Sequence, residues 1–196
     1  MPPRIRAVCL GLAALLVTID IAQAQLDERQ QMLSGGAPRN RSFNLFGFTG
    51  SDVSRTRVSF ASNHRPGTIV INTAERRLYL VQDGGIALRY AIGVGRVGFT
   101  WKGVRKVTEK KEWPGWTPPP QMHARVRGLP AHMPGGIDNP LGARALYLGG
   151  TLYRIHGSND PDTIGQAVSS GCFRLTNDDI KDLYDRVAVG TTVIVQ

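Results

Sequence analysis

The sequence predicts a mainly β protein, an antiparallel β-sandwich or barrel with one short helix near the C-terminus. Short segments rich in β-branched residues, separated by turns, recur between residues 68 and 94. Only residues 177–187 carry apolar side chains at helical spacing. Gly93, Gly95 and Gly98 form no dinucleotide-binding fingerprint, because no strand–helix–strand unit surrounds them. The glycines therefore give no support to a nucleotide-binding α/β domain.

The first 24 residues have the features of a signal peptide. Arg4 and Arg6 form a basic start, residues 8–17 are apolar, and residues 22–24 (Ala-Gln-Ala) supply the small side chains of a cleavage site. The apolar run is too short for a spanning helix, which needs about 20 residues. The sequence therefore predicts export to the periplasm and a mature chain that starts near Gln25.

Export leaves a single cysteine in the mature chain. Cys9 lies inside the signal peptide, so Cys172 remains alone. Paired cysteines usually form disulfides outside the cytoplasm, whereas a single one stays a free thiol. Such a thiol is a liability unless it is buried or used, which favours a catalytic role for Cys172.

The chain is basic, with a net charge of +9. Without the signal peptide, 22 basic and 14 acidic side chains remain. Anionic lipid, nucleic acid and acidic polymers all attract such a protein, and the alternative is that the positive charge only keeps the protein soluble. Because the basic residues are scattered rather than clustered, no nucleic acid is expected as a partner.

Residues 25–66 are predicted to be an irregular N-terminal linker segment. They show no sustained period, and residues 34–42 are rich in residues typical of linkers. The large apolar residues between 43 and 48 either dock on the following domain or form a partner-binding patch. One domain is expected over residues 67–196, a length that is ample for one core.

The domain is expected to begin with a β-hairpin. Residues 68–72 and 77–82 are the predicted strands, and residues 73–75 are the tight connection between them. Residues 83–85 form a second turn, which leads to a third strand over residues 86–94.

Residues 100–140 differ in character and are predicted to be a long connection that forms one wall of a cleft. They contain all three tryptophans and most of the domain's prolines. Trp113 and Trp116, in the stiff segment 113–120, are the expected surfaces for a peptide or sugar. The alternative, given equal weight, is that these side chains plug the core.

Four residues invite a test for a metal site: His123, His132, His156 and Cys172. None of the spacings typical of zinc sites occurs among them. The sequence therefore predicts neither a metal ion nor a cofactor.

One helix is expected over residues 177–187. Thr176 can cap it, and Asp179, three residues later, completes a capping-box pattern. The stripe that faces the core consists of Ile180, Leu183, Tyr184 and Val187. A last strand is expected over residues 191–195.

The chemistry is predicted from the run Ser169-Ser170-Gly171-Cys172-Phe173-Arg174-Leu175 and from His156, which follows an apolar strand. A neighbouring imidazole draws the proton from a thiol and makes the nucleophilic thiolate. Either residue alone is more often structural, the cysteine as a small buried hydrophobe and the histidine as a satisfied core or surface group. Together they predict cysteine catalysis.

The pair sets the expected roles of its neighbours. On an extended stretch Arg174 points to the same side as Cys172, so it is expected to hold a substrate carboxylate; a surface salt bridge is the alternative. Ser170 and Gly171 are expected to border the substrate, and the turn at Gly171 to aim backbone N–H groups at an oxyanion. His156 and Arg174 should supply the positive potential that ionises the thiol near neutral pH.

Two motifs resemble the signature of the L,D-transpeptidase catalytic domain family, of the YkuD type. The first is His156-Gly157 followed by the run at 169–175. The second is Asn-Pro-Leu-Gly-Ala-Arg-Ala-Leu-Tyr-Leu at 139–148, just before the histidine strand. The resemblance covers residues 67–196.

The resemblance implies roles and a substrate. In this family a backbone carbonyl just after the histidine is thought to orient the imidazole, and here that carbonyl belongs to Gly157. The chain departs from the family at Ser170, where many members have a histidine, which leaves His156 and Cys172 as the pair. The implied substrate is a peptidoglycan stem tetrapeptide, whose carboxylates also suit a basic protein.

The implied reaction releases the terminal D-alanine and passes the acyl group to an amine. That amine belongs to a second stem peptide, which gives a 3–3 cross-link, or to a wall-anchored protein. Two alternatives stay open. One is an L,D-carboxypeptidase or amidase that uses water at the same site, and the other is a non-catalytic wall-binding module. The expected state is a monomer.

Overall fold

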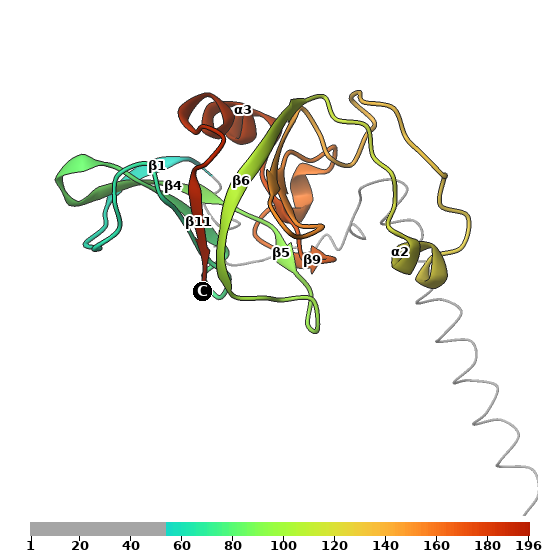
Figure 1. Ribbon diagram of the computed structural model, residues 1–196, viewed down its shortest axis with the longest axis horizontal. Helices are drawn as coiled ribbons and strands as arrows, with labels where there is room; N and C mark the ends of the chain where they lie inside the picture. Colours follow the sequence, from blue (N-terminus) through green and yellow to red (C-terminus); the bar gives the residue numbers. More distant parts are fainter. Residues whose placement is uncertain (1–53) are drawn as a thin grey trace, which may run out of the picture.

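The computed structural model describes residues 54–196 (Figure 1). The predicted signal peptide and most of the predicted linker segment lie outside these described residues. No helix within residues 54–196 combines the length and the apolar character needed to cross a membrane.

The mainly β architecture predicted from the sequence is confirmed. The strands are β1 (Thr56–Ser59), β2 (Ile69–Asn72), β3 (Arg77–Val81), β4 (Ile86–Ala91), β5 (Val94–Gly95), β6 (Gly103–Glu112), β7 (Arg144–Leu148), β8 (Arg154–His156), β9 (Ala167–Ser169), β10 (Phe173–Arg174) and β11 (Thr192–Val195). The helices are α2 (Pro120–Arg125) and α3 (Asn177–Arg186), and two short 3-10 turns are η1 (Asp83–Gly85) and η2 (Pro161–Thr163). Nine strands form one sheet in the order β1-β4-β3-β2-β11-β6-β7-β8-β10, and β5 pairs with β9 beside it.

The predicted hairpin is present as β2 and β3, which pair antiparallel, and β4 continues the meander. Strand β1 pairs with β4 at the sheet edge, so a strand lies inside the segment predicted to be irregular. The guanidinium of Arg55 tethers this edge by an ion pair of 3.0 Å to Asp179 of α3.

Strand β6 joins the two halves of the sheet (Figure 1). Its first part, Gly103 to Lys106, pairs with β11, and its second part, from Val107 onward, pairs with β7. The register shifts between Val107 and Glu109, and such a bulge bends a strand and increases its twist. The single sheet therefore folds across β6, and its two halves can face each other over one core.

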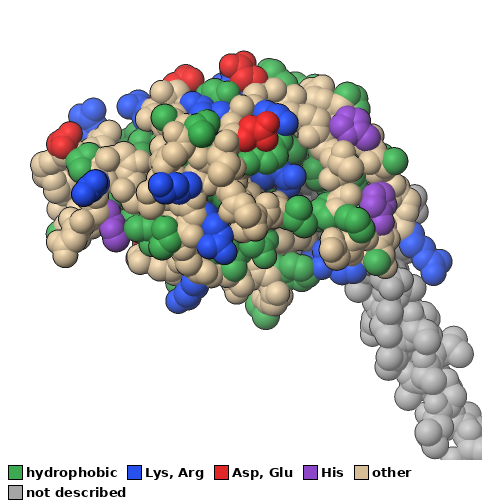
Figure 2. Space-filling view, viewed as in Figure 1, with side chains coloured by type: hydrophobic (Ala, Val, Ile, Leu, Met, Phe, Trp, Pro, Cys, Tyr) green, Lys and Arg blue, Asp and Glu red, His purple; other side chains and the backbone are tan. Residues whose placement is uncertain are grey.

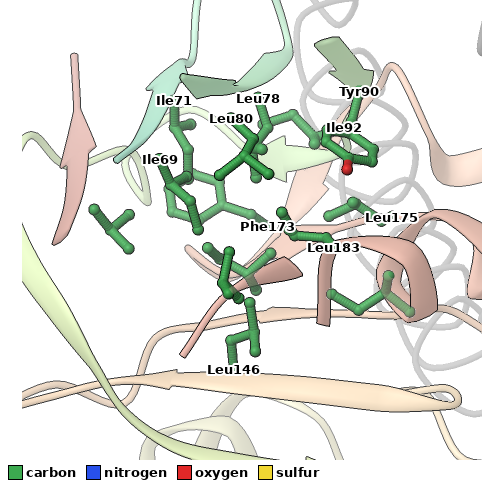
Figure 3. Packing of buried hydrophobic residues seen from close by; sticks show 14 of the residues in the cluster. Ile69, Ile71, Leu78, Leu80, Tyr90, Ile92, Leu146, Phe173, Leu175 and Leu183 are labelled. Carbon is green, nitrogen blue, oxygen red and sulfur yellow. The ribbon is translucent and has the colours of Figure 1, made fainter. Parts of the chain in front are cut away.

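The core lies between these halves and under α3 (Figure 3). From the β2–β4 half it takes Ile69, Ile71, Leu78, Leu80, Tyr90 and Ile92, and from the β6–β10 half Val107, Leu146, Leu148, Ile155 and Phe173. Leu175 and the α3 side chains Ile180 and Leu183 complete it. Burial of a large apolar side chain stabilises a fold by about 1.5–3 kcal/mol, so the cluster fixes how the two halves pack.

The predicted helix is present as α3. The hydroxyl of Thr176 accepts a hydrogen bond from the Asp179 N–H at 3.2 Å, as the capping pattern predicts. At the other end, Lys110 of β6 donates to the carbonyl oxygens of Tyr184 and Val187, both at 2.6 Å. A cation at the last carbonyls also suits the helix dipole.

The prediction of one long connection over residues 100–140 was wrong in part. This stretch contains β6 and the short helix α2. Strand β6 escaped detection because six of its ten residues are charged and only Val107 is buried, so it lacks the apolar alternation of an ordinary strand.

Candidate active site

Strand β8 and the segment at β10 bring four candidate site residues to one side of the sheet. The strands run parallel, with Phe173 beside Ile155 and Arg174 beside His156. Phe173 and Ile155 are buried in the core, so the alternate residues face the other side. There Arg154 and His156 of β8, and Cys172 and Arg174 at β10, all line one cavity. The structure thus brings together the predicted pair and the predicted arginine.

The imidazole of His156 is held in one orientation. Its Nδ1 lies 2.6 Å from the carbonyl oxygen of Gly157. A carbonyl can only accept, so Nδ1 carries the proton and Nε2 keeps its lone pair. A side chain at Gly157 would collide with Asn177 Oδ1 of α3, which leaves room only for glycine there. Packing against α3 therefore fixes the carbonyl that orients the ring.

The same burial keeps His156 neutral. The side chain is 4% exposed. Burial, together with the charges of Arg174 and Arg154, lowers the pKa of His156 from 6.5 to about 3, against the opposing effect of the Gly157 carbonyl. At neutral pH the imidazole is therefore uncharged, and the lone pair of its Nε2 is free.

This shift predicts a loss of stability in mild acid. The unfolded chain binds the His156 proton near pH 6.5, whereas the folded chain binds it only near pH 3, so unfolding takes up a proton between these values. The contribution is complete above pH 6.5 and falls by at most about 1.4 kcal/mol per pH unit below it. Urea unfolding from about pH 7 to about pH 4 should show a smaller decline for His156→Gln than for the unmodified protein. Equal declines would contradict a buried neutral imidazole.

Cys172 sits at the end of a turn held by Ser169. The hydroxyl of Ser169 donates to the Cys172 carbonyl at 2.6 Å and accepts from the Gly171 N–H at 3.1 Å. Gly171 has a φ of 106°, a conformation that favours glycine. The thiol donates to the carbonyl oxygen of Leu152 at 3.9 Å. The turn therefore presents the sulfur to the cavity without using it to hold the fold.

The resting sulfur is a thiol. Burial raises the pKa of Cys172 above its ordinary value, and the positive charges of Arg154 and Arg174 only partly oppose this. The prediction that His156 and Arg174 ionise the thiol near neutral pH was therefore wrong. His156 is uncharged, and desolvation outweighs the arginines.

Trp101 contacts the turn that carries Cys172 from the outside. Its Nε1–H donates to the Gly171 carbonyl at 3.0 Å, and its ring stacks on Tyr153 with centroids 4.8 Å apart. Trp101 was predicted only as part of the aromatic stretch, because its contact with Gly171 joins residues 70 positions apart. No local pattern reports such a contact.

Replacing Trp101 by phenylalanine should destabilise the protein by about 1 kcal/mol. The variant keeps the stack on Tyr153 but leaves the Gly171 carbonyl without its donor. Urea unfolding measures the effect. Trp113→Phe is the matched control, since Trp113 is 42% exposed and makes no such bond, and it should stay within about 0.5 kcal/mol of the parent. Equal effects from both variants would remove Trp101 from this role.

The cavity has a volume of about 520 Å³, which suits a ligand of the size of a short peptide segment. Ser170 and Trp116 belong to its lining, as do Pro119, Gln121 and Met122. Trp113 and Gly171 are not part of the lining. Contact of these residues with a substrate stays a prediction.

The charged side chains that line the cavity are all basic: Arg96, Arg125, Arg154 and Arg174. On the face shown in Figure 2, Lys and Arg are scattered among polar and apolar groups and gather in no single patch. The cavity is therefore more uniformly positive than the surface around it, which favours an anionic ligand.

Arg154 is the site residue that sequence reasoning missed. It lies two positions before His156 on the same strand, so the alternation that placed Arg174 beside Cys172 also places Arg154 on the side of His156. The signal was present in the sequence. Within residues 54–196, no three metal-ligating side chains come together in a way that could hold an ion.

Comparison with known proteins points to the same family as the two sequence motifs. The family model of the L,D-transpeptidase catalytic domain (YkuD) matches residues 66–195. The probable L,D-transpeptidase YbiS of Escherichia coli (strain K12) is 48% identical over 134 residues, which cover 64% of this chain and 43% of that protein. The chain therefore spans less than half the length of this curated relative.

Solved structures share the fold. The NMR structure of the catalytic domain from the E. faecium L,D-transpeptidase has a TM-score of 0.53 at 23% identity, over 69% of this chain and 100% of that one. A crystal structure from Brucella melitensis, of a protein named as a probable carnitine operon oxidoreductase, has a TM-score of 0.50 at 43% identity, over 75% of this chain and 96% of that one. The first likeness bears on the fold alone.

Proposed function

Because the chain belongs to the L,D-transpeptidase catalytic domain family, we propose that it transfers an acyl group from a peptidoglycan stem tetrapeptide to an amine, with Cys172 as nucleophile. The observation that carries this proposal is the arrangement of Cys172 and His156 on adjacent strands facing one cavity. The Gly157 carbonyl occupies Nδ1 of the imidazole and leaves Nε2 to take the proton of the thiol.

The first half-reaction forms a thioester. Cys172 attacks the carbonyl carbon of the donor peptide while His156 takes the thiol proton. The carbonyl oxygen becomes an oxyanion, and because the Gly171 N–H is already bonded to Ser169, the backbone N–H groups of Ser170 and Cys172 are the proposed donors to it. The C–N bond then breaks, and the leaving D-alanine amine takes the proton from His156.

The second half-reaction consumes the thioester. An acceptor amine gives a proton to His156 and attacks the carbonyl carbon. The C–S bond breaks, a new amide forms, and the sulfur recovers its proton from the imidazole. Both halves use the same base, which is consistent with ping-pong kinetics.

The donor is proposed to be anionic. Arg174 adjoins the nucleophile, burial lowers the pKa of its guanidinium, and its Nε is buried without a hydrogen-bond partner. A substrate carboxylate would satisfy this donor and offset the buried charge. Stem peptides carry such carboxylates. On the signal-peptide pattern of residues 1–24, the proposed location is the periplasm.

Mass spectrometry of the protein incubated with a disaccharide-tetrapeptide tests the proposal. The expected adduct has the mass of the donor without its terminal D-alanine, attached at Cys172. Addition of an amine acceptor should remove the adduct and give a cross-linked product. Release of the free tripeptide acid alone, even with acceptor present, would identify a hydrolase. Absence of any adduct with several stem peptides would contradict acyl transfer.

A further inference from the structure

Arg154 lies beside Cys172, whereas Arg174 is the residue predicted to bind the substrate carboxylate. The parallel register of β8 and β10, continued by one residue beyond Ile155 and Phe173, brings Arg154 next to Cys172. Arg154 Nη1 donates to the Leu152 carbonyl at 3.0 Å, and the Cys172 thiol donates to the same oxygen at 3.9 Å. The guanidinium and the sulfur therefore converge on one acceptor.

The guanidinium of Arg154 has one N–H donor, at Nε, that makes no hydrogen bond. Its Cζ lies 5.0 Å from the centroid of the Tyr147 ring, which supports the planar group from one side. Its Nε is buried and has no hydrogen-bond partner. A buried N–H without an acceptor is unfavourable and rare, and such a group calls for a partner in another state of the molecule.

Loss of the thiol proton supplies that partner. The thiol donates its S–H to the carbonyl oxygen of Leu152. A thiolate can only accept hydrogen bonds, so it cannot bond to a carbonyl oxygen, which is also an acceptor. Two nearby groups, Arg154 and Arg174, combine an unused Nε–H with a positive charge. Of the two, Arg154 shares the Leu152 carbonyl oxygen with the sulfur. We propose that Arg154 donates to the sulfur anion of Cys172 and stabilises it each time the anion forms.

The role of this contact in acyl transfer rests on the proposed function, whereas the contact itself does not. During attack the thiol proton moves to His156, the S–C bond forms, and Arg154 stabilises the charge that develops on sulfur. When the thioester breaks, sulfur leaves as the anion and meets Arg154 again before His156 returns the proton. Arg154 is unchanged throughout. The charge of Arg154 lowers the pKa of the Cys172 thiol, as do hydrogen bonds from its backbone N–H and its side chain, which agrees with this contact.

Alkylation of Cys172 by iodoacetamide, a neutral reagent, tests the proposal without any substrate. The rate is measured against pH on the full chain, and peptide mass spectrometry separates Cys172 from Cys9. In Arg154→Gln the midpoint of the pH profile should rise by about one unit or more, with a rate near neutral pH about 10-fold lower. The limiting rate at high pH should change little.

Three further variants make the result specific. Arg125→Gln removes a charge from the same cavity, over the Phe99 ring, and should leave the midpoint in place. Arg154→Lys keeps the charge and should recover part of the shift. Arg154→Met keeps the apolar stem against Tyr147 and carries the test if Arg154→Gln does not fold. An unchanged midpoint in Arg154→Gln or Arg154→Met, or an equal shift in Arg125→Gln, overturns the proposal.

Discussion

Replacing Cys172 by alanine should abolish the acyl-enzyme adduct and lower transpeptidation by about 10⁴-fold or more, while the fold persists. The chemical reason is that no other thiol lines the cavity within the part of the chain that the structure describes. Without sulfur there is no atom to form the thioester, and His156 alone has nothing to activate.

The fold should persist because the sulfur holds nothing in place. Its hydrogen bond to Leu152 is long, at 3.9 Å, while Ser169 and Trp101 hold the turn through backbone atoms. The free energy of unfolding should therefore change by about 1 kcal/mol or less. Mass spectrometry and urea unfolding, on one preparation, measure both quantities.

Cys172→Ser is the matched control. The hydroxyl keeps the shape of the site, but its proton is far harder to remove, so the serine variant should also be inactive. An adduct of the expected mass in Cys172→Ala would place the nucleophile elsewhere. A variant that is inactive because it unfolds would instead show a lowered free energy of unfolding, which the urea measurement detects.

Local elements of the fold were predictable because their signals are local. The hairpin follows from two short β-branched segments around a tight connection, and the Thr176 cap with its apolar stripe is sufficient to place α3. These features depend on residues a few positions apart. The hairpin and α3 could therefore be predicted without knowledge of the tertiary contacts that they make.

Strand β6 shows where this reasoning fails. Its second half pairs with β7 and its first half with β11, and both partners lie far along the chain. The charged side chains of Lys110 and Lys111 find distant neighbours, Tyr184 and Tyr147, that make them acceptable in a strand. Pairing of this kind outweighs propensity and leaves no trace in the local pattern.

The candidate site divides in the same way. His156, Cys172 and Arg174 were named from residue types and spacing, and alternation within a strand also reaches Arg154. The hydrogen bond from Trp101 to the Gly171 carbonyl depends on a contact between distant residues, and the neutral state of His156 depends on its burial. Residue types alone suggest a positive site that ionises a thiol. Burial has the opposite effect on both members of the pair, because it lowers the pKa of His156 and raises the pKa of Cys172.

Replacing His156 by glutamine should lower kcat/KM by about 10²- to 10⁴-fold, the usual contribution of a general base. Glutamine is neutral and can still donate to the Gly157 carbonyl, so the buried site should remain filled and folded. It cannot accept the thiol proton or give it to the leaving amine. The loss should therefore appear mainly in kcat of the acylation step, measured by the growth of the adduct with time.

The pH profile separates this role from a structural one. In the parent, the neutral imidazole is present throughout the range above its lowered pKa of about 3. Acylation near neutral pH therefore does not require that the thiol first loses its proton to the solvent. In His156→Gln that is the only route, and the rate should rise about tenfold per pH unit until the thiol ionises. A variant with the parent's profile, scaled down uniformly, would show that His156 only supports the turn. A steep profile, with Cys172 still alkylated at high pH, would assign the proton transfer to His156.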